Sequence, residues 1–375
     1  TNTDIEKPQY NIVILLLESW SSIFVDSFTH NNFGVTPNFD EIVKESVQYT
    51  NFFANGQRSI DGVTALFSGI PRVEGMSLLG SGLEMSNISL LGNIAKNNNY
   101  QTLAMQSSKR SSFRLDSIAK LAGFDDYYGS EDIPQLGIET SGKQPYFGTW
   151  DNNTLDFFHH KMDQLTPPFM AFAFTSTTHV PYISPGKEWE KYPHDENNIF
   201  GYLNTLKYAD ESLGRFMAKA KQSDWFANTI FIIMADHTLG FGDNRKDFEG
   251  TDLKTEYRPL ENMRIPMAIY APGILPARVD DRIASQADLM PSLIDLLGWK
   301  GEFSSMSKSV FSDSPGFVIF GNGPVIGFVN DQGYLLHSLQ TELENTIEDP
   351  QATDSLLSSY QSITRLLREN NFVSH

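Results

Sequence analysis

The feature that most constrains the fold of this chain is a set of short apolar runs, each only a few residues long. The clearest are Asn11–Leu17, Phe169–Thr175, Thr229–Met234 and Pro266–Tyr270. Continuous apolar character without polar alternation is typical of strands that are buried on both faces. Because helical patterns alternate with these runs, the sequence predicts an α/β sheet with crossover helices.

Helical patterns occupy much of the remaining chain, and Thr36-Pro37 is typical of an N-cap followed by proline at the first helical position. We expect helices at Pro37–Glu45, Leu90–Lys96, Leu115–Leu121, Thr154–Met162, Leu203–Ala220, Leu289–Leu297 and Asp354–Arg368. Three short strands joined by glycine-containing turns, at Phe317–Phe320, Ile326–Asn330 and Tyr334–Ser338, predict a small antiparallel sheet. We therefore expect a main α/β unit over residues 1–300 and a C-terminal subdomain, residues 301–375, packed on it.

Charge and cysteine content exclude several classes of function. The chain has 28 basic and 46 acidic side chains and a net charge of -18, which excludes a nucleic-acid binder. An anionic substrate would need a locally positive site, most simply a bound metal ion. The absence of cysteine excludes disulfides, a cysteine nucleophile, a thiolate zinc site and an iron–sulfur cluster.

The sequence contains no apolar segment of the length that a membrane helix needs. The longest aliphatic run is Ile12–Leu17, against roughly 18 residues for a span. The opening TNTDIEKPQY has no basic and apolar signal regions. Two interpretations stay open: a cytosolic protein, or a domain whose upstream anchor or signal has been removed.

Acidic and imidazole side chains follow two of the predicted strands directly. Glu18 follows Asn11–Leu17, and Asp236-His237 follows the strand that begins at Thr229. Open α/β sheets bind ligands at the carboxyl ends of their strands, and oxygen and nitrogen donors together can hold a divalent cation. The alternatives are a turn-capping glutamate and a buried Asp-His hydrogen-bonded pair.

A third candidate is Ser59, in the segment GQRSIDGVTALFSGIP over residues 56–71. A glycine-containing loop leads into this serine, and the residues that follow can begin a helix, whose N-terminus favours anions. An ordinary N-cap serine would occupy the same position. A serine hydroxyl beside a divalent cation loses its proton more easily, so the three sites together predict a metal-activated nucleophile.

These segments resemble the lipoteichoic acid synthase and phosphoglycerol transferase branch of the alkaline phosphatase superfamily. The matching blocks are NIVILLLESW, VTPNFDEIVKESVQYTNFFANGQRS, TSTTHVPY, FIIMADHTLGFGD, IPMAIYAPG and ASQADLMPSLIDLLG, which span most of the chain in family order. The resemblance implies an alkaline-phosphatase-like, mostly parallel sheet flanked by helices. It also implies that Glu18, Asp236 and His237 bind a metal together with Ser59, the nucleophile, which stands where the family usually has threonine.

The resemblance also indicates residues that contact the substrate. His179, in TTHVPY, matches a histidine that contacts the phosphate or its polar head, and Trp150, in YFGTWD, resembles a pocket tryptophan. A histidine satisfied beside a turn and a buried core tryptophan are the alternatives. Where the family often has a substrate-binding histidine, the chain reads MQSSKRSSF, so Ser107, Lys109 or Arg110 is expected to bind the anion. For the two basic residues, the alternative is a surface basic cluster.

The resemblance implies a transferase that takes glycerol phosphate from a phospholipid such as phosphatidylglycerol to a glycan or glycolipid acceptor. It favours one manganese ion over magnesium or zinc, and a location outside the cytoplasmic membrane, on a membrane-anchored protein that works at a bilayer surface. The rival functions are a phosphodiesterase or phosphatase, a phosphoethanolamine transferase, and a non-catalytic relative that binds lipid or glycan.

Two related activities fit the sequence less well. Sulfatases need Pro and Arg at fixed spacing after the modified Cys or Ser, but Ser59 is followed by Ile60, Asp61 and Gly62. Phosphoethanolamine transferases carry several disulfides, which this chain cannot form.

Overall fold

A computed structural model describes residues 9–29, 31–138, 143–240, 248–249, 251–253 and 260–370 of the chain. Its core is an eight-stranded sheet in the order β4-β3-β5-β1-β6-β7-β2-β8. The strands are β1 (Asn11–Leu17), β2 (Ser46–Phe53), β3 (Gln101–Gln106), β4 (Asp126–Tyr128), β5 (Phe169–Phe174), β6 (Thr229–Ala235), β7 (Met267–Tyr270) and β8 (Arg278–Ser285). β7 runs antiparallel to both of its neighbours, and the other pairs are parallel.

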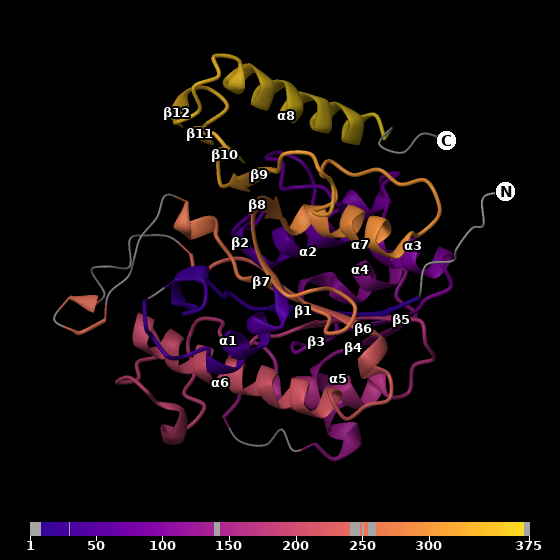
Figure 1. The fold of residues 1–375 in the computed structure, drawn as a ribbon, viewed down its shortest axis with the longest axis vertical. Helices are drawn as coiled ribbons and strands as arrows, with labels where there is room; N and C mark the ends of the chain where they lie inside the picture. The colour runs from indigo at the N-terminus through magenta and orange to yellow at the C-terminus, as the bar shows by residue number, and fades with distance from the viewer. Residues whose placement is uncertain are drawn as a thin grey trace.

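Helices cover both faces of this sheet (Figure 1). One face carries α1 (Pro37–Lys44), α5 (Asp151–Met162) and α6 (Ile199–Ala220). The other carries α2 (Ser59–Ser68), α3 (Leu91–Asn97), α4 (Leu115–Leu121) and α7 (Leu289–Leu297). The short 3-10 helices are η1 (Ser22–Phe24), η2 (Leu83–Met85), η3 (Ser112–Arg114), η4 (Ser130–Leu136), η5 (Lys187–Trp189), η6 (Phe226–Asn228), η8 (Glu261–Met263) and η9 (Gln286–Asp288).

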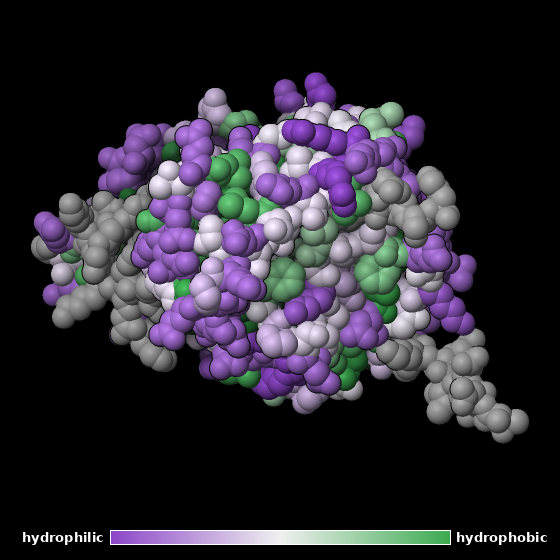
Figure 2. Space-filling view, turned by 90° about the horizontal axis from the view of Figure 1, so that it is seen from above, coloured by the Kyte–Doolittle hydropathy of each residue, from purple (hydrophilic) through white to green (hydrophobic). Residues whose placement is uncertain are grey.

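A second, antiparallel sheet lies beside β8, and its strand order is β12-β11-β10-β9. Its strands are β9 (Phe317–Asn322), β10 (Val325–Asn330), β11 (Gly333–His337) and β12 (Glu342–Asn345), and α8 (Ala352–Arg368) follows them. Ile326 and Leu335 of this sheet form a small apolar cluster with Leu356 of α8. Seen from the side of α8, the surface is mostly hydrophilic with small, separate hydrophobic areas (Figure 2).

The predicted fold class is confirmed, and the differences concern individual elements. α5 and α6 begin at Asp151 and Ile199, each a few residues before the predicted start. The side chain of Asn198 accepts hydrogen bonds from Phe200 N and Gly201 N and so begins α6. Five strands were not predicted from the sequence, and all of them mix polar and apolar residues: β2, β3, β4, β8 and β12. Within the described residues, no helix has both the length and the apolar character needed to cross a membrane.

The N-terminus of α1 is capped by a side chain from α6, far away in the sequence. Thr36 occupies the N-cap position, as predicted, but its side chain makes no capping hydrogen bond. Instead, the buried carboxylate of Asp210 on α6 accepts from Phe39 N at 2.8 Å and from Asn38 N and Nδ2 at 2.9 Å each. A long-range contact therefore satisfies the amides that a local cap usually satisfies.

The central strands end together at one edge of the sheet. β1 lies between β5 and β6, with Leu16 opposite Phe174 and Leu17 opposite Ala235. Every residue of β1 is buried, which explains the uninterrupted apolar run. The residues that follow these strands are consequently close neighbours, although they come from distant parts of the sequence.

Candidate active site

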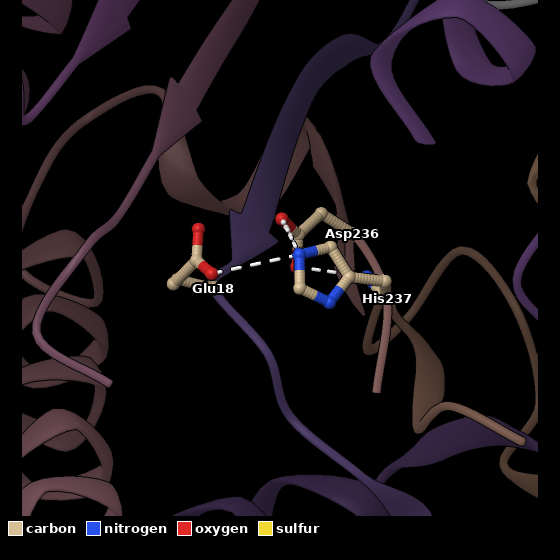
Figure 3. Close-up of side chains that lie close together, drawn as sticks. All are labelled: Glu18, Asp236 and His237. Atoms are coloured by element: carbon tan, nitrogen blue, oxygen red, sulfur yellow. Dashed lines mark hydrogen bonds and ion pairs between the residues drawn. The ribbon is translucent and has the colours of Figure 1, made fainter. Parts of the chain in front are cut away.

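Glu18, Asp236 and His237 meet at this edge of the sheet (Figure 3). Glu18 follows β1 and the other two follow β6, and one ligand atom of each lies within 4.8 Å of the others. His237 Nε2 is 3.3 Å from Asp236 Oδ2 and 3.6 Å from Glu18 Oε1. The predicted ligands are therefore brought together by the pairing of two adjacent parallel strands.

Backbone amides orient the Asp236 carboxylate. Oδ1 accepts from Ser19 N and from His237 N, each at 2.8 Å. Ser19 has a φ of 55°, a left-handed conformation that is uncommon for a residue other than glycine. The turn after β1 thus adopts a strained conformation in which its amide contacts the carboxylate of the neighbouring strand.

The His237 ring is oriented by the hydrogen bond of its outer nitrogen. Nδ1 lies 2.6 Å from the carbonyl oxygen of Thr238, so Nδ1 carries a proton and Nε2 is the ring nitrogen that faces the carboxylates. The Thr238 hydroxyl donates to the carbonyl oxygen of Asn262 at 2.6 Å, which anchors this turn to η8. Such support of the second ring nitrogen is typical of histidine ligands of metals.

The cluster places two buried carboxylates beside one imidazole. Glu18 is 3% exposed and Asp236 is 0% exposed. Burial, and after it the Asp236 charge, raises the pKa of Glu18 to about 8. Although burial opposes protonation of His237, the two carboxylates raise its pKa above the ordinary value. Two buried carboxylates beside one imidazole are costly unless a cation or protons neutralise them.

The residues fit a divalent metal ion. Within the described residues, Asp236 Oδ2 is a buried oxygen without a hydrogen bond, and it faces the centre of the cluster. Metal bonds of about 2.0–2.2 Å leave neighbouring donor atoms roughly 3–3.5 Å apart, close to the separations between these side chains. Two carboxylates and one imidazole are donors that suit manganese, magnesium or zinc.

Ser59 is the first residue of α2, as predicted, and lies next to this cluster. Its Oγ is 3.4 Å from Glu18 Oε2 and 3.4 Å from His237 Nε2. Both separations are at the long end for hydrogen bonds, so the two contacts are weak. Asp61 fixes the first turn of the helix, because it accepts from Arg58 N at 3.1 Å and pairs with Arg72 at 3.0 Å. The hydroxyl therefore lies at a rigid helix N-terminus, where the dipole favours anions.

His179 lies in the loop after β5, on the Glu18 side of the cluster. Thr178, its neighbour, donates to the carbonyl oxygen of Glu18, and Thr175 Oγ1 accepts from Glu18 N at 3.2 Å. The His179 ring contacts the Phe147 ring edge to face, with centroids 4.5 Å apart. Burial lowers the pKa of His179, so the imidazole is neutral near pH 7.

The remaining predicted substrate residues have varied surroundings. Ser107 is buried after β3, where its N–H donates to Phe174 O and its carbonyl accepts from Thr149 N. The Arg110 guanidinium is held by two hydrogen bonds to Asp132, at 2.7 and 2.6 Å, and Lys109 beside it is exposed. The half-buried Trp150 donates from its indole to Lys143 O and packs against Tyr208. Roles in substrate binding for these residues stay predictions.

Several supporting residues were missed by the sequence analysis. Ser19 and Thr178 are sequence neighbours of predicted site residues, so their positions were a usable signal. Asp151, at the start of α5, accepts from Ser176 N and Thr177 N at 3.0 Å each and thereby holds the loop that contains His179. This contact joins residues 25 and 26 positions apart, and no local pattern indicates it.

Comparison with known proteins identifies the family. A family model described as Sulfatase matches residues 10–299. The chain belongs to the sulfatase family. The predicted resemblance is confirmed by lipoteichoic acid synthase 1 of Bacillus subtilis (strain 168). The two sequences are 26% identical over an alignment of 385 residues, gaps included, which covers 97% of this chain and 56% of that protein. Phosphoglycerol transferase I of Salmonella typhi is 26% identical over 245 residues, 62% of this chain and 31% of that one.

Solved structures share the fold. A protein of the alkaline phosphatase superfamily from Vibrio parahaemolyticus has a TM-score of 0.81 at 23% identity, covering 99% of this chain and 90% of that chain. The lipoteichoic acid synthase LtaP from Listeria monocytogenes has a TM-score of 0.72 at 16% identity, covering 99% and 94%. This chain spans about half the length of lipoteichoic acid synthase 1, at 56%.

Proposed function

We propose that this chain is the catalytic part of a metal-dependent transferase that moves glycerol phosphate from a phospholipid to a glycan or glycolipid acceptor. The observation that carries the proposal is the position of Ser59, whose Oγ lies 3.4 Å from both Glu18 and His237 at a helix N-terminus. The proposed nucleophile therefore lies beside the proposed metal ligands and at a helix end that favours anions. Phosphoryl transfer needs these three components.

Glu18, Asp236 and His237 would hold one divalent ion, with the Ser59 hydroxyl as a further ligand, and manganese is the ion that the family resemblance favours. When bound, the ion supplies positive charge that favours the deprotonated serine and offsets charge on the phosphate. The amides of Ser19 and His237 keep the Asp236 carboxylate in place while substrate binds.

The reaction is a double displacement at phosphorus. In the first step Ser59 Oγ forms a bond to phosphorus and loses its proton, while the bond from phosphorus to the lipid oxygen breaks and that oxygen takes up a proton. With phosphatidylglycerol as donor, diacylglycerol leaves and glycerol phosphate stays on Ser59. In the second step an acceptor hydroxyl displaces Ser59 and restores its proton.

His179 would contact the polar head of the donor. Because its Nδ1 bonds to the Val180 carbonyl, Nε2 of the neutral ring is an acceptor that suits a hydroxyl of the glycerol head. We propose that the same binding region is lined by Ser107, Arg110 and Trp150. The segment of Ser107 and Arg110 is joined to the segment of Trp150 by the hydrogen bond from Thr149 N to Ser107 O, beside the end of β5.

The similarity to lipoteichoic acid synthase 1 and phosphoglycerol transferase I supports this assignment over sulfate ester hydrolysis. Ser59 is followed by Ile60, Asp61 and Gly62, without the proline and arginine that mark a sulfatase nucleophile for modification. The relatives and the lipid donor together suggest the outer face of a bacterial cytoplasmic membrane, with this chain as the soluble domain of an anchored protein.

Intact mass after incubation with manganese and phosphatidylglycerol tests the proposal. We expect a glycerol-phosphate-sized adduct or release of diacylglycerol, and neither product with Ser59→Ala. Repeated release, well above one diacylglycerol per protein molecule, with water as the sole acceptor would indicate a phosphodiesterase. A manganese-loaded protein that gives neither adduct nor release would exclude phosphatidylglycerol as the donor.

A further inference from the structure

A buried glutamine, Gln286, joins the two halves of the proposed site. It begins η9 and is 0% exposed. Its Nε2 donates to the carbonyl oxygens of Ala235, at 2.9 Å, and Asp236, at 2.5 Å. Its Oε1 accepts from Asn55 N at 3.0 Å. One side-chain amide therefore spans from the end of β6 to the loop that leads to Ser59.

The carbonyl oxygens that Gln286 binds belong to the segment that carries the metal ligands. Ala235 is the last residue of β6, where pairing with β1 ends. A buried carbonyl at the end of a strand needs a partner outside the ladder. Gln286 thus binds two successive carbonyl oxygens directly before His237.

Asn55 extends this connection toward Ser59 and toward the second sheet. It is 1% exposed, its Oδ1 accepts from Ala287 N at 3.0 Å, and its Nδ2 donates to Ile319 O at 2.8 Å. It follows β2 and precedes Ser59 by four residues. Both buried amides are satisfied by neighbouring segments, which makes the connection rigid.

The helix that carries Ser59 packs against the same carbonyl. A Cβ on Gly62 of α2 would lie 2.5 Å from Asp236 O and 2.9 Å from Gln286 Nε2. Only glycine allows this approach, so the first turn of α2 is in direct contact with the Asp236 backbone. The Asp236 carbonyl therefore contacts both the helix that carries Ser59 and the glutamine that binds the segment of the metal ligands.

We propose that Gln286 is a positioning residue that holds the Asp236–His237 turn at a set distance from Ser59. The inference rests on the proposed metal site, to which Gln286 contributes no ligand atom. A neutral amide is suited to the task, because it donates two hydrogen bonds without placing a charge among the carboxylates. Mutating groups that hydrogen-bond to metal-ligating side chains changes metal affinity by about 10- to 100-fold, and we expect an effect of similar size for Gln286, which binds the backbone of Asp236.

Two substitutions test the role against a matched control. Gln286→Met has a similar length and removes all three hydrogen bonds, whereas Gln286→Glu keeps the shape and replaces the donor nitrogen by oxygen. The control is Gln48→Met in β2, a glutamine that is 7% exposed and donates to Ser27 O. Gln48 lies near the opposite end of β2 from Asn55, so its loss affects stability alone.

The first measurement is hydrogen exchange of the metal-free proteins. In the Gln286 variants we expect faster exchange of the amides of Asn55 and of the Asp236–His237 turn, and unchanged exchange there in Gln48→Met. Protection equal to that of the wild type would overturn the inference. Because this measurement needs no metal, it decides the question even if the wild type binds none, which would refute the proposed function separately.

The second measurement is manganese titration by calorimetry. Both Gln286 variants should bind manganese about 10- to 100-fold more weakly, while Gln48→Met should bind as the wild type does. If Gln286→Met does not fold, the nearly isosteric Gln286→Glu decides the outcome. A folded Gln286→Glu protein with wild-type affinity would refute the positioning role.

Discussion

The hydroxyl oxygen of Ser59 lies 3.4 Å from Nε2 of His237, although 178 positions separate the two residues in the sequence. The outer nitrogen of the ring is held by the Thr238 carbonyl, and the serine is held by the first turn of α2. Neither side chain depends on the other for its orientation. The site is therefore preorganised, which is the condition under which electrostatic catalysis is effective.

Ser59→Thr is expected to retain activity, whereas Ser59→Ala should lose it. Threonine keeps the hydroxyl, so turnover of phosphatidylglycerol should stay within about tenfold of the wild type. Loss of the nucleophile should reduce turnover by at least about 10³-fold. Diacylglycerol release with manganese in excess measures both. Equal activity of the alanine variant would show that Ser59 is not the nucleophile.

Glu18→Gln should have opposite effects on stability in the absence and presence of metal. In metal-free protein above about pH 8, where the Glu18 carboxyl is ionised, the substitution removes a buried charge beside Asp236 and should raise the melting temperature. With manganese at 100 times its dissociation constant, the wild type should gain about 2.7 kcal/mol of unfolding free energy. The variant should gain far less. Thermal unfolding with chelator and with manganese checks both signs, and equal gains would exclude Glu18 as a ligand.

His179→Ala is expected to weaken catalysis without affecting metal binding. Loss of one polar contact to the donor head should lower kcat/KM by about 10- to 100-fold, or about 1.4–2.8 kcal/mol. Manganese affinity should be unchanged, because the ring lies outside the ligand set. The control is His160→Ala, since His160 is exposed on α5. A parallel loss of manganese affinity would assign His179 to the metal site.

Asp210→Asn should destabilise the protein by about 1–3 kcal/mol, because it disrupts buried hydrogen bonds to the start of α1. An exposed control, Asp313→Asn, should change stability by no more than about 0.5 kcal/mol. Urea unfolding monitored by circular dichroism measures both variants. A loss no larger than that of the control would show that Asp210 does not cap α1.

The effect of Asp210→Asn on the unfolding free energy should also depend on pH. Burial raises the pKa of Asp210 from 3.8 to about 7, so between these values the folded protein binds one proton more than the unfolded chain. The contribution of Asp210 to stability is therefore greatest below about pH 4 and falls as the pH rises to about 7. The difference in unfolding free energy between wild type and Asp210→Asn should narrow over this range. A widening difference would show that the ionised carboxylate is the favoured folded form.

Local sequence determined the parts of the fold and site in which the signal lies within a few residues. The uninterrupted apolar run of β1 identified a central strand, and its position identified Glu18 as a strand-end carboxylate. The same logic located Asp236 and His237 after β6. Hydrophobic burial on both faces of a strand is a strong local constraint, and so these predictions were correct for the strands.

Other strands could not be recognised because their burial is uneven. β8 is an edge strand with several exposed positions, and every residue of β12 is exposed. Their sequences, RVDDRIAS and ELEN, have no continuous apolar character. Pairing with a neighbouring strand, which sequence patterns do not encode locally, decides that such segments are extended.

The sequence by itself determined the residue types at the site, while the tertiary structure alone decided how they are held. Nothing near Thr36 indicates that Asp210 caps α1, and nothing near Asp236 indicates that Gln286 binds its carbonyl oxygen. The φ of 55° at Ser19 likewise has no local signal. Buried amides and carbonyls must be satisfied by whatever groups the fold brings near, so their partners become known only when the sheet and its helices are assembled.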